Sequence, residues 1–338
     1  MAKQLGYACI NMTLAKQGIS CNRSMIRRTF DAKGVAYASE LILENLRNLT
    51  KIVSWNNQNG IKVYRMSSNM FPWMSEYEFT DLPDYDKICN LLKGIGTLAM
   101  ENGQRLSFHP GQFCVLASPN EEVVLNAMNE LDKSAQIMDL MGLPESRMAK
   151  INIHVGGAYG NKKAALERFC KNFLRLQPSA QARLTVENDD KANMYSVKDL
   201  YEGVYKVVGI PIVFDYFHHK FCTGGMTEEE ALKLAASTWG DIKPCTHYSE
   251  SRRAEKKLVI EQICENNNIT MEQMQDWPTL AGHYKEFSKI KEQAHSDYIK
   301  EEIKDYGLDI DVVVEAKAKE LAFMREEYKK VLTEVLPC

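Results

Sequence analysis

The chain has 338 residues, of which 45% are hydrophobic and 26% charged, and its formal net charge at pH 7 is −3. This length suits a single α/β barrel with insertions, and the composition is ordinary for a globular protein with a sizeable core. A net charge near zero argues against a strongly basic DNA-coating protein, although a local basic rim can still bind phosphates. The sequence contains no run of 18 or more apolar residues and no signal-peptide core. We therefore expect no membrane span and an intracellular location.

The nine cysteines are scattered, and none belongs to a Cys-x-x-Cys pair. An odd, unpatterned number of cysteines in a chain of this length predicts reduced thiols and not a disulfide framework. This interpretation agrees with an intracellular location.

Short apolar strands are predicted to alternate with helices. The predicted strands are residues 4–11, 61–67, 105–109, 150–155, 183–187, 210–216, 243–248 and 310–315. The predicted helices are residues 39–58, 85–100, 121–141, 162–176, 196–207 and 227–239, and a last helix that runs to about residue 331. Residues 12–38 read as a long polar connection. Thr227 and Glu230 predict a capping box at the start of one helix.

Residues 252–294 do not fit a single strand-to-helix step. They predict extra helices at 252–266 and 271–293, the second interrupted by Trp277-Pro278. We interpret the segment as a helical insertion on the rim, between the seventh and eighth strands. No internal repeat or linker occurs, so residues 1–338 are expected to form one domain that carries this insertion.

The alternation of strands and helices predicts a parallel sheet, and eight strands match a TIM (β/α)8 barrel. The alternative is an open, doubly wound sheet. We favour the barrel because candidate ligands close many separate strands, and a closed ring brings all the carboxyl ends together. An open sheet would gather its site at one switch point.

Most predicted strands end on a histidine or a carboxylate. In strand 183–187 the apolar run ends on Glu187, and a buried carboxylate is costly unless a cation or several donors meet it. The same pattern recurs at His109, His154, Asp215, His218, His247 and Glu315. Mixed imidazole and carboxylate ligands suit Zn²⁺, Mn²⁺ or Fe²⁺. Their number predicts a multinuclear metal site with Glu187 near its middle.

A single histidine at a strand end is more often a satisfied polar residue than a ligand. That alternative weakens here because each of several strand ends would need its own unrelated partner. Adjacent side chains of an extended chain point in opposite directions, so we favour His218 over His219 as the ligand. His283 lies in the insertion and is expected on the surface.

Several segments resemble the UV damage endonuclease family. The most specific are His109-Pro-Gly-Gln112 and Val186-Glu-Asn-Asp189, and others are Tyr64-Arg-Met-Ser-Ser68, Asn152-Ile-His-Val-Gly-Gly157, Phe214-Asp-Tyr-Phe-His218 and Val314-Glu-Ala-Lys317. The resemblance runs in order over nearly the whole chain, apart from the insertion. It implies a TIM barrel and a metal-dependent DNA repair endonuclease that starts excision repair. Such an enzyme nicks the backbone immediately 5′ of cyclobutane pyrimidine dimers and 6-4 products, and sometimes of abasic sites.

The resemblance also implies two or three divalent ions, with Mn²⁺ preferred and Zn²⁺ or Mg²⁺ as alternatives. The matched ligands are His109, His154 and Glu187 for one ion, Glu187, Asp215, His247 and Glu315 for a second, and His218 and His295 for a third. Glu187 would then bridge two ions. The implied partner is UV-damaged double-stranded DNA. We expect a monomer that contacts no membrane and is cytoplasmic or associated with the nucleoid.

Gln112-Phe113 matches a Gln-Tyr pair with which the family fills the space left by a flipped lesion. Phenylalanine can still wedge and stack, but it has no hydroxyl. Without the resemblance, Phe113 would be interpreted as a core aromatic residue. Tyr7 and Asn11 match residues near the lesion pocket and the metals, which implies catalytic roles for both and lesion binding for Tyr7.

The sequence departs from the family at Cys245. Members often carry a carboxylated lysine two residues before the histidine matched by His247. A thiol cannot reproduce a carbamate, so the metal preference and the pH dependence are in doubt, although every proposed ligand is present. Two other functions compete with the nuclease. One is a sugar isomerase or epimerase on the same barrel, in which Gln112-Phe113 would have no role. The other is a damage-binding protein without catalytic activity.

Overall fold

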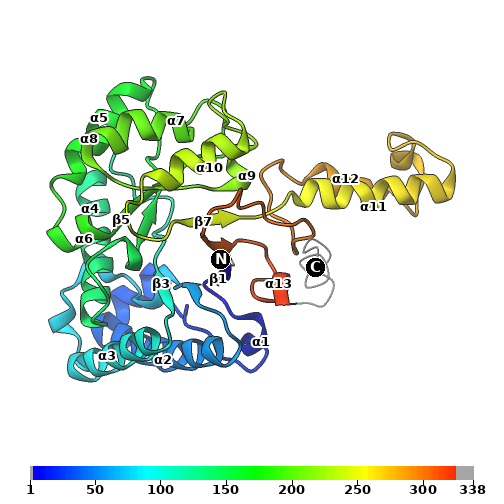
Figure 1. The fold of residues 1–338 in the computed structure, drawn as a ribbon. Coiled ribbons are helices and arrows are strands. Elements are labelled where there is room, and N and C mark those ends of the chain that lie inside the picture. Colours follow the sequence, from blue (N-terminus) through cyan, green and yellow to red (C-terminus); the bar gives the residue numbers. More distant parts are fainter. Residues whose placement is uncertain (1–2, 325–338) are drawn as a thin grey trace, which may run out of the picture.

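Eight parallel strands form a closed ring in the computed structural model, which describes residues 3–324 (Figure 1). They are β1 (Gln4–Ala8), β2 (Val63–Arg65), β3 (Arg105–Ser107), β4 (Ile151–Ile153), β5 (Leu184–Glu187), β6 (Ile212–Val213), β7 (Cys245–Tyr248) and β8 (Asp311–Val314). The ladders run in the order β3-β2-β1-β8-β7 and β4-β5-β6. Parallel bridges from Phe108 to Ile151 and from Asp215 to His247 join the two sheets at both sides. The ring is therefore closed, and the predicted TIM barrel is confirmed.

Helices surround the ring. They are α1 (Met12–Ala15), α2 (Arg27–Gln58), α3 (Tyr85–Glu101), α4 (Glu121–Leu140), α5 (Lys162–Phe173), α6 (Pro178–Arg183), α7 (Val197–Leu200), α8 (Lys206–Val208), α9 (Tyr216–His219), α10 (Glu228–Ser237) and α13 (Leu321–Met324). A π-helical turn (Tyr201–Tyr205) joins α7 to α8, and the predicted capping box of Thr227 and Glu230 starts α10. The predicted continuation of the last helix to about residue 331 lies outside the described residues.

The prediction for residues 12–38 is wrong in part, because α2 already begins at Arg27. Its first turns are separated from the predicted helix by Gly34, whose φ of 63° and ψ of −159° break the helical path. This short segment has no apolar period of its own. Phe30 instead packs against Trp73, with the ring centroids 6.0 Å apart. A tertiary contact of this kind leaves no local signal in the sequence.

Side chains inside the ring alternate with side chains that face the helices. The inner apolar layer is formed mainly by Ala8, Val63, Val213, Cys245 and Val313. In the same interior, Arg105 Nη1 lies 3.0 Å from Asp311 Oδ2, so this buried cation has its counter-charge. The main core lies between the ring and the helices. The ring interior is therefore packed, and the site is confined to its mouth.

The predicted helical insertion is confirmed. It consists of α11 (Arg252–Asn267), the 3-10 turn η6 (Gln273–Asp276) and α12 (Ala281–Ser288), which lie between β7 and β8. We call residues 252–294 the arm. Its two helices extend side by side away from the ring (Figure 1). They pack through a small core of their own, formed by Ile260, Cys264, Met274 and Phe287.

Within residues 3–324 the structure has no helix with the length and apolar character needed to cross a membrane. The eight cysteines in this part of the chain are free thiols, in agreement with the predicted absence of a disulfide framework.

Two glycines of α3 provide a matched test of this packing. A Cβ added at Gly96 would lie 1.8 Å from the Met141 carbonyl oxygen, whereas a Cβ at Gly94 would meet no atom within 4 Å. We expect Gly96→Ala to lower the free energy of unfolding by about 1–3 kcal/mol through overpacking. Gly94→Ala should raise it by about 0.5–1 kcal/mol, since alanine favours a helix. Urea unfolding of both variants measures the difference, and effects of the same sign would contradict this packing.

Candidate metal centre

Glu187 ends β5 at the mouth of the ring, and only 1% of its side chain is exposed. Asn152 on β4 donates its side-chain amide to Oε2 of this carboxylate. Four imidazoles approach the Glu187 oxygens: His247 Nδ1 at 3.0 Å, His109 Nε2 at 3.3 Å, His218 Nδ1 at 3.4 Å and His154 Nε2 at 4.0 Å. The structure thus surrounds the buried Glu187 carboxylate with one amide donor and four imidazoles, groups that can meet its charge directly or through a shared cation.

These histidines come from different strands and meet because the ring is closed. His109 and His154 follow β3 and β4, and His247 lies on β7. His218 lies on α9, just after β6. Asp215 caps that helix by accepting from the His218 backbone N–H at 2.7 Å, which turns the chain so that His218 faces Glu187.

Nδ1 lies close to a further oxygen in three of the four histidines. Nδ1 of His109 lies 3.0 Å from the Pro110 carbonyl oxygen, and Nδ1 of His218 lies 2.9 Å from that of Asn188. Nδ1 of His154 lies 2.9 Å from Asp189 Oδ1, an ion-pair contact without hydrogen-bond geometry. An Nδ1 proton held by such a partner leaves Nε2 as the lone pair available to a ligand, an arrangement typical of metal-binding histidines.

A second group lies on the other side of Glu187. His247 Nδ1 is 3.2 Å from Glu315 Oε1, and His295 Nδ1 is 3.8 Å from Glu315 Oε2. Asp215 is fully buried, and its Oδ2 has no hydrogen-bond partner within residues 3–324. A buried carboxylate oxygen without a donor calls for a cation.

The residues therefore fit a metal. His109, His154 and Glu187 form one set in which all ligand atoms lie within 4.8 Å of one another, and Glu187, Asp215 and His247 form another such set. Both sets share Glu187. Imidazole nitrogens and carboxylate oxygens in these numbers suit divalent transition metals. His218, His295 and Glu315 lie beside the two sets.

The charges of these groups are strongly coupled. Burial alone would raise the pKa of Glu187, but the surrounding imidazoles, His247 and His154 foremost, lower it well below its usual range. Burial likewise opposes ionisation of Glu315, yet Arg65 and His247 lower the pKa of that carboxyl. Burial raises the pKa of Asp215 to about 7, and the negative charge of Glu187 adds to this effect.

The two flanking histidines shift in opposite directions. Burial lowers the pKa of His247 to about 4, so this imidazole is neutral at pH 7. Burial would also lower the pKa of His218, but the charges of Asp215 and Glu187 outweigh it and raise the pKa to about 9. His218 therefore carries a proton in the metal-free protein, and a metal ligand must lose that proton.

Two buried cations at this site were missed by the sequence analysis. Arg65, at the end of β2, forms an ion pair with Glu315. Its position in the Tyr64-Arg-Met-Ser-Ser68 segment, at a strand end, was the available signal. Lys150 precedes β4, is fully buried, and places Nζ 3.3 Å from His247 Nε2. No local pattern marks Lys150 as an interior residue.

Lys150 is relevant to Cys245, the position at which this sequence lacks the lysine that the family resemblance implies. Burial lowers the pKa of Lys150, and the Cys245 thiol acts in the opposite direction. Cys245 belongs to the inner apolar layer of the ring, and His247, two residues further along β7, lies 3.3 Å from the Lys150 amine. An amine therefore lies close to the strand that carries residue 245.

Gln112 and Phe113 lie on an exposed turn after His109, and Phe113 is 80% exposed. The core interpretation of Phe113 is therefore wrong. An aromatic ring standing in solvent beside a buried polar centre is an unusual placement for a large apolar side chain.

Tyr7 and Asn11 are placed differently. Tyr7 belongs to the core between ring and helices, and its hydroxyl donates to Asn56 Oδ1 at 2.8 Å. Asn11 donates to the Tyr7 hydroxyl at 2.9 Å, and its Oδ1 caps α1 by accepting from the Leu14 backbone N–H. The structure does not bring either polar group to the histidines, so their catalytic and lesion-binding roles stay predictions.

The other three histidines lie in different surroundings. His219 packs against Phe214, with ring centroids 5.3 Å apart. His283 is exposed on the arm. His295 lies beside His218, with ring centroids 6.3 Å apart.

Removing metal should make the stability of the protein depend on His218. Its folded pKa of about 9 exceeds the unfolded value of 6.5, so its contribution is complete below pH 6.5 and is lost as pH rises through 9. We expect the Tm of EDTA-treated protein to fall over this range.

Mn²⁺ affinity should rise by up to about tenfold per pH unit as the proton is displaced. Calorimetric titration at pH 7 and 9 measures this, and His283→Gln should leave the pH dependence intact whereas His218→Gln flattens it. Equal behaviour of the two variants would contradict the assignment.

Exchanging the side chains of residues 150 and 245 tests whether they are neighbours inside the ring. Cys245→Lys adds a second buried amine without a counter-charge, which should cost about 3–5 kcal/mol of unfolding free energy. The double variant Lys150→Cys/Cys245→Lys holds one amine again, so it should recover most of this loss together with its metal content. Chemical unfolding and metal analysis compare the three proteins. A double variant as unstable as Cys245→Lys would show that the two side chains do not share one space.

Comparison with known proteins agrees with the fold and identifies the family. Residues 3–334 match the family described as UV-endonuclease UvdE. The chain is 31% identical over 296 residues to the UV DNA damage endonuclease of Bacillus mycoides, covering 84% of this chain and 80% of that protein. It is 35% identical over 259 residues to the UV-damage endonuclease of Schizosaccharomyces pombe, covering 73% of this chain but 42% of that protein.

Solved structures give the same result. SacUVDE superposes with a TM-score of 0.77 at 29% identity, covering 99% of both chains. Endonuclease IV from Thermus thermophilus superposes with a TM-score of 0.53 at 11% identity over 98% of this chain and all of that one, which shows a shared fold alone. Because the family match covers nearly the whole chain, this protein belongs to the UV-endonuclease family.

Proposed function

We propose that this protein is a metal-dependent endonuclease that nicks UV-damaged double-stranded DNA. The cut falls immediately 5′ of cyclobutane pyrimidine dimers and 6-4 products, and also of some abasic sites. It acts as a monomer inside the cell and begins excision repair. The observation that carries the proposal is the buried Glu187, shared by two sets of candidate metal ligands at the mouth of the ring. Family membership supplies the substrate class.

We assign His109, His154 and Glu187 to one ion and Glu187, Asp215, His247 and Glu315 to a second, while His218 and His295 would serve a third. The close approach of the ligand atoms of His109, His154 and Glu187, and of Glu187, Asp215 and His247, supports the first two assignments. Mn²⁺ is the proposed ion, with Zn²⁺ and Mg²⁺ as alternatives. When bound, such ions supply Lewis acidity toward phosphate oxygens and hydroxide at neutral pH.

The protein groups have separate tasks. Glu187 remains ionised at neutral pH because its pKa is lowered, so it can join two cations without first losing a proton. Arg65 pairs with Glu315 and orients this carboxylate. Asn152 fixes the rotation of the Glu187 carboxylate through its amide. These contacts preorganise the ligand oxygens before the DNA arrives.

Lesion recognition is assigned to Gln112 and Phe113. The ring of Phe113 is largely in solvent, so it is free to enter a duplex at a weakened step. A photoproduct is already poorly stacked, and its extrusion therefore costs less than that of an ordinary base pair. A sugar isomerase would have no use for this exposed turn, and the family match argues against that alternative.

A nicking assay with Glu187→Gln tests the proposal. The substrate is an end-labelled duplex with one cyclobutane dimer, incubated with Mn²⁺ or with EDTA. We expect the wild-type protein to cut immediately 5′ of the dimer only when metal is present. Glu187→Gln should lose more than about 100-fold in rate, since even residues that merely orient metal ligands are worth 10–100-fold. It should still bind the damaged duplex.

The matched control is Glu229→Gln, which removes an exposed carboxylate on α10. It should cut at the wild-type rate. Full activity of Glu187→Gln would exclude the bridging role of this residue. A wild-type protein that cuts neither dimer nor abasic DNA with Mn²⁺, Zn²⁺ or Mg²⁺ would overturn the nuclease itself and favour a damage-binding protein without activity.

A further inference from the structure

The foot of the arm is tied directly to the candidate metal centre. Ser251 and His295 form an antiparallel bridge, in which the Arg252 backbone N–H donates to the Ala294 carbonyl at 2.8 Å. Ser296 N–H donates to the Glu250 carbonyl, also at 2.8 Å. The arm therefore starts and ends beside His295, and its foot has a defined position relative to the mouth of the ring.

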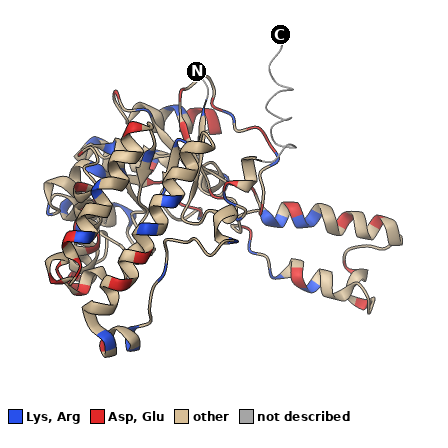
Figure 2. Ribbon diagram, turned by 90° about the horizontal axis from the view of Figure 1, so that it is seen from below, with Lys and Arg blue, Asp and Glu red and all other residues tan. Residues whose placement is uncertain are grey.

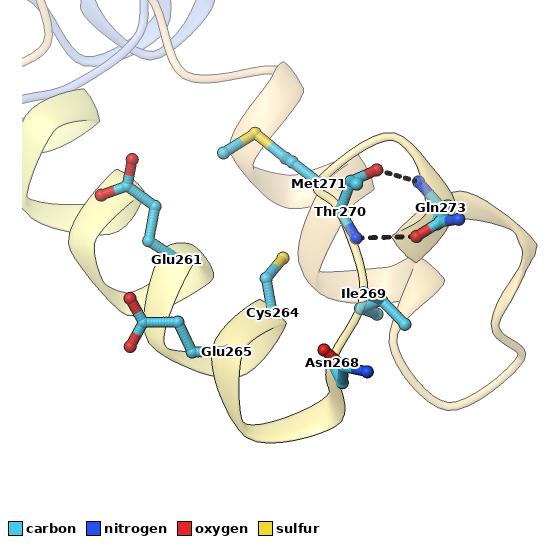
Figure 3. Close-up of a pocket in the computed structure, with 8 residues that line it drawn as sticks. All are labelled: Glu261, Cys264, Glu265, Asn268, Ile269, Thr270, Met271 and Gln273. Carbon is cyan, nitrogen blue, oxygen red and sulfur yellow. Dashed lines mark hydrogen bonds between the residues drawn. The ribbon is translucent and has the colours of Figure 1, made fainter.

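The charge of the arm changes along its length. All its basic residues lie in the first and last parts of the arm, at Arg252, Arg253, Lys256, Lys257, Lys285, Lys289 and Lys291, where they outnumber the acidic Glu255, Glu286 and Glu292. Residues 258–284, which include the tip, contain four acidic residues and no lysine or arginine (Figure 2). A hollow near the tip shows this clearly, since Glu261 and Glu265 line it and no lysine or arginine does (Figure 3). Helix α11 has 16 residues, so about 24 Å separates its two ends. The positive charge is thus concentrated at the end nearest the metal centre.

A groove of about 390 Å³ collects these cations where the arm meets the ring. Arg252, Lys289 and Lys291 line it from the arm, and Lys317 lines it from the loop after β8. Among residues 3–324, no carboxylate lines the groove. Lys317 lies two residues beyond Glu315, so the groove opens next to the candidate metal ligands.

The lysines of the groove are not neutralised by the protein. Lys289, Lys291 and Lys317 are exposed, and none forms an ion pair with a carboxylate in the described part of the chain. Arg252 has only a distant partner, Asp297 at 4.0 Å. Elsewhere on the surface exposed lysines do pair, as Lys206 does with Glu202 and Lys233 with Glu229. Cations gathered without counter-charges repel one another, and a polyanion relieves that repulsion.

We propose that this groove binds the phosphate backbone of the duplex that flanks the lesion, so that the arm is a second DNA contact beside the metal centre. The inference rests on the proposed function, because the polyanion is taken to be the DNA substrate. Lysines contact phosphates without reading sequence, so the groove would add affinity and orientation and leave damage selectivity to Gln112 and Phe113. The acidic tip would repel the duplex, which limits the contact to the foot.

The test is the salt dependence of DNA binding by Lys289→Gln/Lys291→Gln. Both side chains are exposed and unpaired, so the variant should fold normally. Each lost phosphate contact lowers the slope of log K against log salt by about 0.9, and the double variant should therefore lose about 1.8. Binding of a damaged duplex is measured with full-length protein carrying Glu187→Gln, so that no cleavage occurs. The matched control is Lys206→Gln/Lys233→Gln, which removes the same charge from outer helices and should leave the slope unchanged.

Shortening the duplex on one side of the dimer gives a second measurement. The parent protein should lose affinity when the flank that reaches the groove is shortened, and the double variant should lose much less. The groove proposal would be wrong if the double variant kept the salt slope of the parent protein, or if both proteins lost the same affinity when the duplex is shortened. The same slope measured on undamaged duplex separates the two proposals. A protein that never cuts damaged DNA but still loses about 1.8 in slope would refute the nuclease and retain the groove.

Discussion

The site depends on the burial of one carboxylate. Glu187 can end a buried strand only because imidazoles and an amide surround it, and those donors can surround it only if their strands curve into a ring. The same groups that make the carboxylate tolerable have the chemistry of metal ligands. Stability of the folded chain and formation of the centre are therefore coupled, since every donor that is removed leaves an uncompensated charge.

Closure of the ring rests on two single bridges and not on long ladders. Asp215 and His247, which form one of these bridges, are also candidate ligands. Short pairing at this seam leaves their side chains at the strand ends, where they turn into the mouth. A bound cation between Asp215, His247 and Glu187 would hold the same seam together, so metal would reinforce the fold at its least extensive ladder.

The interior of the barrel accommodates a substitution within its family. Where the resemblance to the family implies a lysine, this chain has Cys245, and the Lys150 amine, just before β4, lies 3.3 Å from Nε2 of His247 on the same strand as Cys245. The groups near His247 therefore include an amine as well as the Cys245 thiol. At the outer rim, the foot of the arm adds exposed positive charge outside the buried centre. In the proposed nuclease, the buried cluster would serve the chemistry and the exposed cations would position the duplex through its phosphates.

Much of this protein was determined by the sequence alone. Alternation of apolar runs with helices predicted the barrel, and histidines or carboxylates at strand ends predicted which side chains meet, because the carboxyl ends of parallel strands share one edge. The insertion and the capping box of α10 were also readable, since both depend on local pattern. Of the two adjacent histidines the sequence favoured His218, and the structure places His218 Nδ1 3.4 Å from Glu187, although the chain there is a short helix and not a strand.

Other features were decided only by tertiary structure. The burial of Lys150 beside His247, the pairing of Arg65 with Glu315 and the exposure of Phe113 all depend on which segments become neighbours, and no local period encodes such contacts. The placement of Tyr7 was also not predictable, because neighbouring residues of a strand point alternately into the ring and toward the helices, and Tyr7 points toward the helices. The basic groove likewise exists only because the arm folds back so that its two ends meet beside His295. Sequence patterns report the chemistry of each strand end, whereas the charge balance of the centre arises only when all the ends converge.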